Sequence, residues 1–352
     1  MSLSSLQSRS ISSFAVAILL LASSSSVLQA QDQSGGGTLV RDMMGGAALI
    51  FRTPDNPPVQ GTNASSTSSV GGGRVSPNRP PQSRSGDQEQ LIARGNAARK
   101  AGTPRYSEAE EQYKLAARHD PNDARAHAGL GNVYLDQNRF AEAVAAYQQA
   151  IKVRPDYLAV YMPLGYSLVR LNNYTEAIET YKKTLQLDPG NPEIYNNLGF
   201  AYNHLEQYDE SVGACQQAIQ LLGQQDRAYK LGLQNRDEVL GYAYKNLGNA
   251  YNDLKQYQEA VRALRQATLI DPNSAAAHFN LGSAYYNAGQ NAEAVEAYKQ
   301  VIKLKPALPG AHFNLGLAYI ALHNDRAALE EYNALKKLNA NLASQLQSLI
   351  NR

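Results

Sequence analysis

The sequence predicts an all-α fold in which pairs of helices stack into a solenoid. Three observations lead to this prediction. Leu-Gly pairs recur at a fixed spacing from about residue 88 onward, the same small and large residues flank each glycine, and prolines close several of the units. A period of roughly 20 to 50 residues is typical of repeat proteins, in which each unit buries its apolar face only against its neighbours.

The repeated glycine sets the register, and slots are counted from it, so that slot −2 lies two residues before it. These glycines are Gly131, Gly165, Gly199, Gly248, Gly282 and Gly316, at spacings of 34, 34, 49, 34 and 34 residues. The residues at slots −4, −1, 0 and +3 fall on one stripe of a first helix. Small residues at slots +12 and +19 let a second helix approach closely, and a large residue at +16 fills the remaining volume.

The first thirty residues predict a secretory signal. Arg9 is their one basic residue, and the apolar run from Phe14 to Ala22 is nine residues long. Because a hydrocarbon core requires about 20 apolar residues, this run is typical of a signal peptide, with cleavage after Ala30. The alternative is an uncleaved anchor. We therefore expect an exported chain, periplasmic or secreted.

Residues 31–87 are rich in Gly, Ser and Pro and poor in apolar side chains. Such a segment does not offset its ordering entropy by burial, so we expect a disordered linker. Residues 39–51, LVRDMMGGAALIF, are the apolar exception. They are either scattered hydrophobic residues in a disordered arm or a short docking segment.

The repeats resemble a known family. The pattern HAGLGNVYLDQNRFAEAVAAYQQAIKVRP, residues 127–155, is similar to the tetratricopeptide repeat, and it is the first of six in-phase copies. A weaker seventh copy precedes them at residues 94–121, with two extra residues near Pro104, and residues 340–352 suit a capping helix. The resemblance implies a right-handed superhelical solenoid over residues 88–352, with a concave groove that binds other proteins.

Two departures from the pattern bear on this expectation. One spacing of 49 residues predicts an insertion near residues 221–239, either a tolerated surface connection or a partner contact. Pro163 stands at slot −2 of its repeat. Near the first turn of the helix it is harmless, whereas further in it would kink the helix.

Composition and motifs exclude several function classes. The net charge is +2, and no basic cluster of the kind that binds nucleic acid is present. The sequence has no His-Glu-x-x-His, Cys-x-x-Cys or Gly-x-Ser-x-Gly motif. Cys215 takes a core slot, and His127, His278 and His312 occupy slot −4, where other repeats have tyrosine. We expect no catalysis, no metal and no cofactor.

A row of amides is the main candidate for a binding site. Slot −2 is asparagine in four consecutive repeats, namely Asn197, Asn246, Asn280 and Asn314. The slot lies roughly opposite the core stripe, on the helix face that would line the inner groove, so these amides are suited to bond the backbone of an extended peptide. Neighbouring groove slots hold Lys245, Asn249, Phe200, Phe279 and Phe313. The alternative is a family consensus without a ligand.

The row resembles the asparagine ladder in the repeat domain of O-linked N-acetylglucosamine transferase, which holds target polypeptides. That resemblance implies that the four asparagines contact peptide, while Gly129 and Pro163 interrupt the row. A second comparison is with carboxylate-clamp repeats, which Lys245, Asn249 and Asn280 match in part. Gly310 and Asn314 stand where that clamp has two basic residues, so we do not expect it.

The sequence thus predicts an exported, non-catalytic scaffold or adaptor that binds a protein or extended peptide in its concave groove. We expect no nucleic-acid partner and no membrane span after processing. Two alternatives remain open: a structural subunit of an envelope secretion or polysaccharide assembly that uses its convex face, and a substrate-recognition arm for a separate enzyme.

Overall fold

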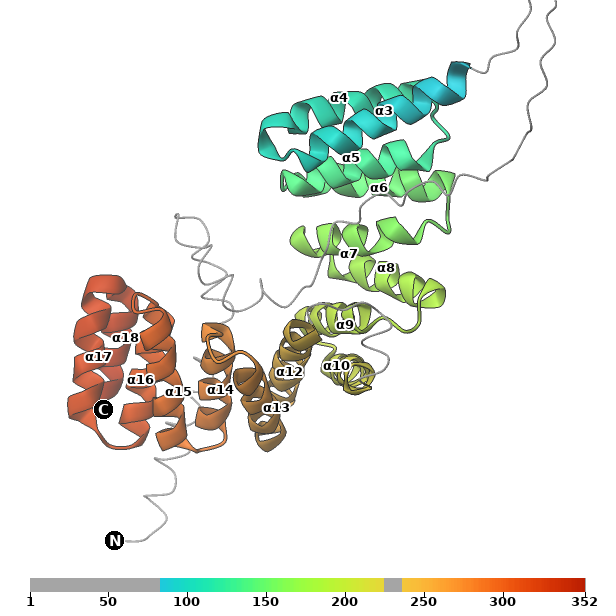
Figure 1. The fold of residues 1–352 in the computed structure, drawn as a ribbon. Helices are drawn as coiled ribbons and strands as arrows, with labels where there is room; N and C mark the ends of the chain where they lie inside the picture. The colour runs from blue at the N-terminus through green and yellow to red at the C-terminus, as the bar shows by residue number, and fades with distance from the viewer. Residues whose placement is uncertain (1–82, 225–235, 352) are drawn as a thin grey trace, which may run out of the picture. The chain divides into compact units, whose positions relative to one another are not determined.

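A computed structural model describes residues 83–224 and 236–351, and every regular element in these ranges is helical (Figure 1). The predicted signal peptide, nearly all of the linker with its segment 39–51, and residues 225–235 of the predicted insertion lie outside the described residues. No helix in the described ranges combines the length and the apolar character needed to cross a bilayer.

The helices form two compact units, and the division falls inside α12, between Ala250 and Tyr251. The N-terminal unit contains α3 (Ser83–Lys100), α4 (Tyr106–His119), α5 (Ala124–Asp136), α6 (Phe140–Val153), α7 (Tyr161–Arg170), α8 (Tyr174–Leu187), α9 (Pro192–His204), α10 (Tyr208–Gly223) and most of α12 (Arg236–Asp253). The C-terminal unit contains the end of α12, α13 (Tyr257–Ile270), α14 (Ala275–Asn287), α15 (Asn291–Leu304), α16 (Pro309–Ala321), α17 (Asp325–Leu338) and α18 (Ala340–Ile350).

Within each unit the helices pack in chain order. From α3 to α10 and from α13 to α18, every helix contacts the next one along the chain. First helices of neighbouring repeats also touch, as α3 does α5 and α14 does α16. This order confirms the predicted solenoid fold class, because each pair of described helices buries its apolar face against its neighbours along the chain.

The repeat glycine makes room for the large residue at slot +16. A Cβ atom added at Gly131, Gly165 or Gly282 would come within 2.5, 2.3 or 2.7 Å of the ring of Tyr147, Tyr181 or Tyr298. All three tyrosines are buried. The close contact explains why one slot stays glycine while letters around it change.

A left-handed residue closes the first helix of every repeat at slot +7. These residues are Asn138, Asn172, Glu206, Lys255, Gly289 and His323, with φ between 56° and 75°. Gly102 (φ 82°) stands seven residues after Gly95, so the weak seventh copy shares the same turn. Its two extra residues follow that turn, where the 3-10 helix η2 (Thr103–Arg105) lies. The left-handed conformation at this slot is not evident from the sequence, because the residue type there differs from repeat to repeat.

In five repeats, the side chain at slot −4 joins the first helix to the preceding turn. The Nε2 atoms of His127, His278 and His312 donate to the carbonyl oxygens of Pro121, Pro272 and Pro306 at 3.0, 3.0 and 2.9 Å. In other repeats the hydroxyls of Tyr161 and Tyr195 donate to the corresponding carbonyls of Pro155 and Pro189. Histidine and tyrosine therefore alternate at this slot because both reach the same acceptor.

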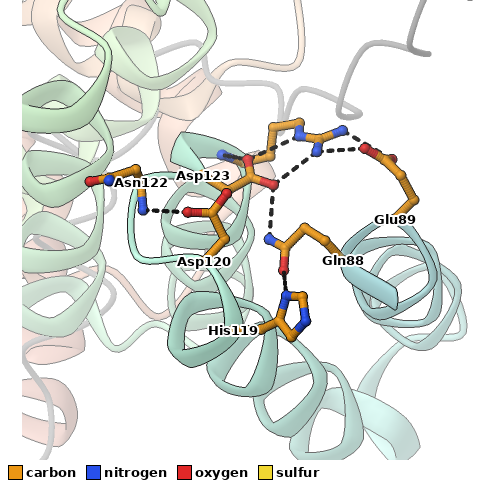
Figure 2. Close-up of polar contacts among 7 residues, drawn as sticks. Gln88, Glu89, His119, Asp120, Asn122 and Asp123 are labelled. Atoms are coloured by element: carbon orange, nitrogen blue, oxygen red, sulfur yellow. Dashed lines mark hydrogen bonds and ion pairs between the residues drawn. The ribbon is translucent and has the colours of Figure 1, made fainter. Parts of the chain in front are cut away.

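A polar network fixes the start of α5 (Figure 2). Asp123 is the N-cap residue, and its carboxylate accepts from the backbone N–H of Arg125 at 3.0 Å and from Gln88 Nε2 at 2.9 Å. Gln88, which is buried, also pairs with His119 Nδ1 at 3.1 Å. Burial by itself would raise the pKa of Asp123, but hydrogen bonds from Arg125 and Gln88 hold it below its usual value. The network ties α3 to the turn between α4 and α5.

The two departures from the repeat pattern have simple structures. Pro163 lies in the first turn of α7, after the short η3 (Leu158–Val160), where a backbone N–H has no helical partner, so the harmless interpretation holds. The predicted insertion at 221–239 is helical at both ends, since α10 runs to Gly223 and α12 begins at Arg236. Leu222 and Val239 pack together there.

Candidate peptide-binding groove

The structure places the predicted groove residues in two groups, one in each unit. Asn197 and Phe200 lie on α9, and Lys245, Asn246 and Asn249 lie on α12, all in the N-terminal unit. The C-terminal unit carries the other four, Phe279, Asn280, Phe313 and Asn314, on α14 and α16. Four of the nine are buried, namely Asn197, Phe200, Lys245 and Asn246, and the remaining five are half-buried.

The burial of Asn197 and Asn246 differs from the expected exposed row of amides. Their exposed fractions are 0% and 1%, and Asn196 is also 0% exposed. Asn246 Nδ2 donates to Asn196 Oδ1 at 3.1 Å, and Asn196 Nδ2 donates to Asn197 Oδ1 at 3.2 Å. Asn203 Nδ2 adds a bond to the backbone oxygen of Asn246 at 2.9 Å. Contrary to the expectation from the sequence, packing therefore explains why slot −2 is asparagine in α9 and in α12.

Slot −2 faces the slot +16 residue of the repeat before it. A Cβ atom at Gly129 would approach the Tyr113 ring to 2.3 Å, so the glycine that interrupts the amide row makes space for a tyrosine. In the C-terminal unit, burial raises the pKa of the Tyr298 phenol, and Asn314 lies close enough to offset part of that rise. The slot thus lies at the junction between repeats, at the edge of the groove, which sequence periodicity within one helix does not reveal.

Slot +1 supplies a partner for the buried phenol of its own repeat. Tyr147 donates to Asn132 Oδ1 at 2.8 Å, and the hydroxyls of Tyr298 and Ser283 lie 3.1 Å apart. In the repeat of Gly165 the slot holds Tyr166, and the buried Tyr181 hydroxyl has no hydrogen-bond partner. The residues at slots +1 and +16 therefore form a hydrogen bond in two of these repeats, whereas the repeat of Gly165 lacks that bond.

The predicted residues of the C-terminal unit are partly in the core. Phe279 meets Tyr298 edge-on at a centroid distance of 5.7 Å and packs among Ala275, Val301 and Ala311. Phe313 packs on the cluster around Leu335 and Leu346. Both phenylalanines are nevertheless half-buried rather than buried, as are Asn280 and Asn314. This unit carries the more accessible part of the predicted site.

Lys245 is not a surface cation. It is 5% exposed, and its Nζ atom lies 5.1 Å from the centroid of the Tyr242 ring. A cation over an aromatic face is stabilised by the ring quadrupole. Two observations therefore argue against a carboxylate clamp: Lys245 is buried, and glycine stands at position 310, where the clamp has a basic residue.

A strip of aromatic and cationic side chains crosses α6 to α9 and was missed by the sequence analysis. Phe140 meets Tyr166 at 6.3 Å and lies 4.4 Å from the Arg170 guanidinium. One repeat later, Tyr174 stacks on His204 at 4.5 Å, and His204 in turn lies 4.5 Å from Phe200. We call these residues the aromatic strip: Phe140, Tyr166, Arg170, Tyr174, Phe200 and His204. Its signal in the sequence is the aromatic residue at slot +9, followed in the next repeat by slots +1 and +5.

Among the residues that the structure describes, the one cysteine is not arranged as a nucleophile, and no cluster of His, Cys, Asp and Glu is arranged for metal binding. Cys215 is 0% exposed, and burial raises the pKa of its thiol to about 12, so the reactive thiolate is strongly disfavoured. Within the described ranges, no group of three or more His, Cys, Asp or Glu side chains is placed to hold a metal ion. An open hollow of about 460 Å³ over α14 and α15 is lined by other residues, including His278, Tyr285 and Glu293, and by none of the predicted groove residues.

Family models match the repeats directly. A TPR repeat model matches residues 131–172, 165–205, 248–289 and 283–322, and a tetratricopeptide repeat model matches residues 193–223. Residues 131–223 and 248–322 are therefore tetratricopeptide repeats. The matched residues lie on either side of the insertion, and they leave α3, α4, α17 and α18 outside.

Several solved structures share this fold. A tetratricopeptide repeat protein from Parabacteroides merdae aligns with a TM-score of 0.53 and 17% identity, over 76% of this chain and 100% of its own. PilW, a type IV pilus biogenesis factor, aligns with a TM-score of 0.54 and 21% identity, over 64% and 98%. PilF of Pseudomonas aeruginosa gives 0.52 and 17%, over 65% and 99%. At such identities the likeness shows the fold alone. No curated protein matches the sequence.

Proposed function

We propose that this protein is a non-catalytic scaffold that binds an extended segment of another polypeptide along the inner faces of its first helices. The supporting observation is repetition: equivalent slots of successive first helices carry amide, aromatic and cationic side chains that are partly exposed. In the N-terminal unit these include Arg170, His204 and Asn249, and in the C-terminal unit Asn280 and Asn314. Repeated donors and acceptors suit a peptide backbone, whose polar groups also recur along the chain.

The proposal divides the predicted amides by role. Asn196, Asn197 and Asn246 are buried and bonded to one another, so they hold α9 against α12 and shape the surface. Asn249 and Asn280 have partly exposed amides and are the contacts we assign to the ligand. Amide and aromatic side chains favour an uncharged or mildly acidic peptide over a polyanion.

Export remains part of the proposal. It is supported by the apolar run from Phe14 to Ala22 and by the small residue Ala30 that follows it. N-terminal sequencing of the protein isolated from its native source tests this directly. We expect a mature chain that begins at Gln31, whereas an intact N-terminus would favour a retained anchor.

Peptide selection with matched variants tests the binding function. A random peptide library is selected on the full chain, and the affinity of the recovered peptides is measured for an Asn249→Ala, Asn280→Ala variant. The control is Gln148→Ala, Gln266→Ala, which removes two exposed amides from second helices. Loss of two hydrogen bonds to the ligand lowers affinity by about fivefold or more. Equal affinity for both variants would reject the groove, and loss only in the control would favour the alternative that the outer face binds partners.

A further inference from the structure

The aromatic strip has a chemistry that the amide row lacks. Arg170 and His204 are exposed, Phe140, Tyr166 and Tyr174 are half-buried, and Phe200 forms the floor beneath His204. Arg170 also donates to the Tyr166 hydroxyl at 2.8 Å, which orients the guanidinium beside the rings. Flat rings with one cation at the edge suit an apolar segment that carries a single acidic residue.

We propose that residues 39–51 of the same chain dock on the aromatic strip. Between residues 31 and 82 this segment alone concentrates large apolar side chains: Leu39, Val40, Met43, Met44, Leu49, Ile50 and Phe51. Methionine sulfur and aromatic side chains both pack favourably against aromatic rings. The segment carries one acidic residue, Asp42, beside one basic residue, Arg41, so it is neutral overall and only the Asp42 carboxylate complements Arg170 on the strip.

The connecting chain is long enough for this contact. Residues 52–82 separate the segment from α3 and contain six prolines, five serines and four glycines. A random coil of that length has an end-to-end distance of about 30 Å, and prolines extend it further. From α3 the strip lies two helix contacts away, since α3 touches α5 and α5 touches α7. Neighbouring helices are about 8 to 10 Å apart, so the strip lies about 20 Å from α3 across the row of helices. The tether joins α3 at Ser83, whereas Arg170 and His204 lie toward the opposite ends of their helices, and the 18 residues of α3 add about 27 Å along the helix axis. The separation is therefore about 34 Å, close to the length of the tether. The tether therefore holds the segment near the strip at an effective concentration in the millimolar range.

This inference rests on the proposed function, because the docked segment occupies part of the surface that a partner peptide would use. A partner must displace it, so the free chain is partly self-inhibited. For a weak contact with a dissociation constant near 100 µM, removal of the segment raises the affinity for a competing peptide by about tenfold.

A single introduced fluorophore tests the docking. The chain contains no tryptophan, so a Phe51→Trp substitution in the full chain supplies the only indole and keeps an aromatic body at that position. A Val70→Trp chain places the indole elsewhere in the arm as the matched control. We expect acrylamide quenching of the Phe51→Trp chain to be about threefold or more weaker than that of the control. We also expect Arg170→Ala with His204→Ser, both at exposed positions, to abolish the difference.

Three results would overturn the inference. Equal quenching in the two chains would mean that the segment does not dock. Protection that survives Arg170→Ala with His204→Ser would place the contact away from the strip, and protection that rises with protein concentration would make a second copy the occupant. No partner peptide is present in this assay, so its failure leaves the peptide-selection result for the proposed function standing.

Discussion

Asn246 on α12 donates a hydrogen bond to Asn196 on α9 at 3.1 Å, and both side chains are buried. The bond joins the two first helices on either side of the insertion, where the spacing between repeat glycines is 49 residues instead of 34. In the N-terminal unit, the asparagine at slot −2 therefore stabilises the packing of two helices. Any test of ligand binding by substitution at this slot must therefore separate lost binding from lost packing.

A double-mutant cycle measures that structural contribution. Asn246→Ala and Asn196→Ala should each lower the free energy of unfolding by about 1 to 3 kcal/mol, because each leaves the other amide with a buried polar group that has lost a partner. The double variant should cost less than the sum of the two. Urea titrations followed by circular dichroism give the three values. A strictly additive double variant would indicate that the two amides do not interact.

Tyrosine to phenylalanine substitutions test the pairing of slots +1 and +16. The Tyr181 hydroxyl is buried without a partner, whereas the Tyr147 hydroxyl donates to Asn132 at 2.8 Å. Tyr181→Phe should leave the melting temperature unchanged or raise it, since it removes an unsatisfied polar group. Tyr147→Phe should destabilise by about 1 to 2 kcal/mol because it orphans the Asn132 oxygen. Equal losses in the two variants would contradict the assignment.

Glycine substitutions within one repeat test the close contact between helices. A Cβ atom at Gly199 would lie 2.3 Å from Cys215 Sγ, while a Cβ atom at Gly213 would meet nothing within 4 Å. Gly199→Ala should therefore destabilise by about 1 to 3 kcal/mol, and Gly213→Ala should stabilise by about 0.5 to 1 kcal/mol as an alanine in a helix. Adding Cys215→Ala to Gly199→Ala should recover part of the loss. A neutral Gly199→Ala variant would show that the two helices separate at little cost.

His312 predicts a pH dependence in the C-terminal unit. Its Nδ1 lies 2.6 Å from Glu331 Oε2 and its Nε2 lies 2.9 Å from the Pro306 carbonyl oxygen, and the bond to Glu331 is the main cause that raises the pKa of His312. Protonated histidine donates to both acceptors. The stabilisation is complete below the unfolded pKa of about 6.5 and is lost as pH rises through the higher folded pKa.

Thermal melts at pH 6 and pH 8.5 measure this effect. The chain should lose on the order of 1 kcal/mol more across that range than a His312→Tyr variant. Tyrosine is the matched replacement, because Tyr161 and Tyr195 fill the same slot in other repeats and bond the same carbonyl without titrating in this range. Identical pH profiles for the two chains would show that His312 is not the titrating group.

Repetition made most of the fold predictable. The recurring glycine set the register of the helix pairs, and His312 took the packing position expected from its slot. Of the two alternatives for Pro163, the structure shows the harmless one, in the first turn of α7. The left-handed residue at slot +7 was not predicted, because residues as different as Asn138, Lys255 and His323 adopt it. Hydrogen bonds at the end of the helix impose this backbone conformation, so many side-chain types can occupy the position.

The candidate site was less predictable than the fold, for a physical reason. Periodicity within one helix assigns a face to Asn197 and Asn246, but burial also depends on what the neighbouring repeat places there. Asn196 fills the space beside Asn246, and Tyr113 fills the space at Gly129. The aromatic strip was missed for the same reason, since Tyr174 and His204 belong to different repeats and meet only when these stack.

Site-specific photo-cross-linking tests the binding of an extended peptide along the first helices most directly. A photoreactive amino acid is introduced at Asn280 or at His204 on first helices, and at Gln266 or Gln148 on second helices, in the full chain with a selected peptide bound. We expect peptide adducts from the first-helix positions and none from the second-helix positions. Adducts formed only from the second helices would contradict groove binding and make the outer face the site of partner contact.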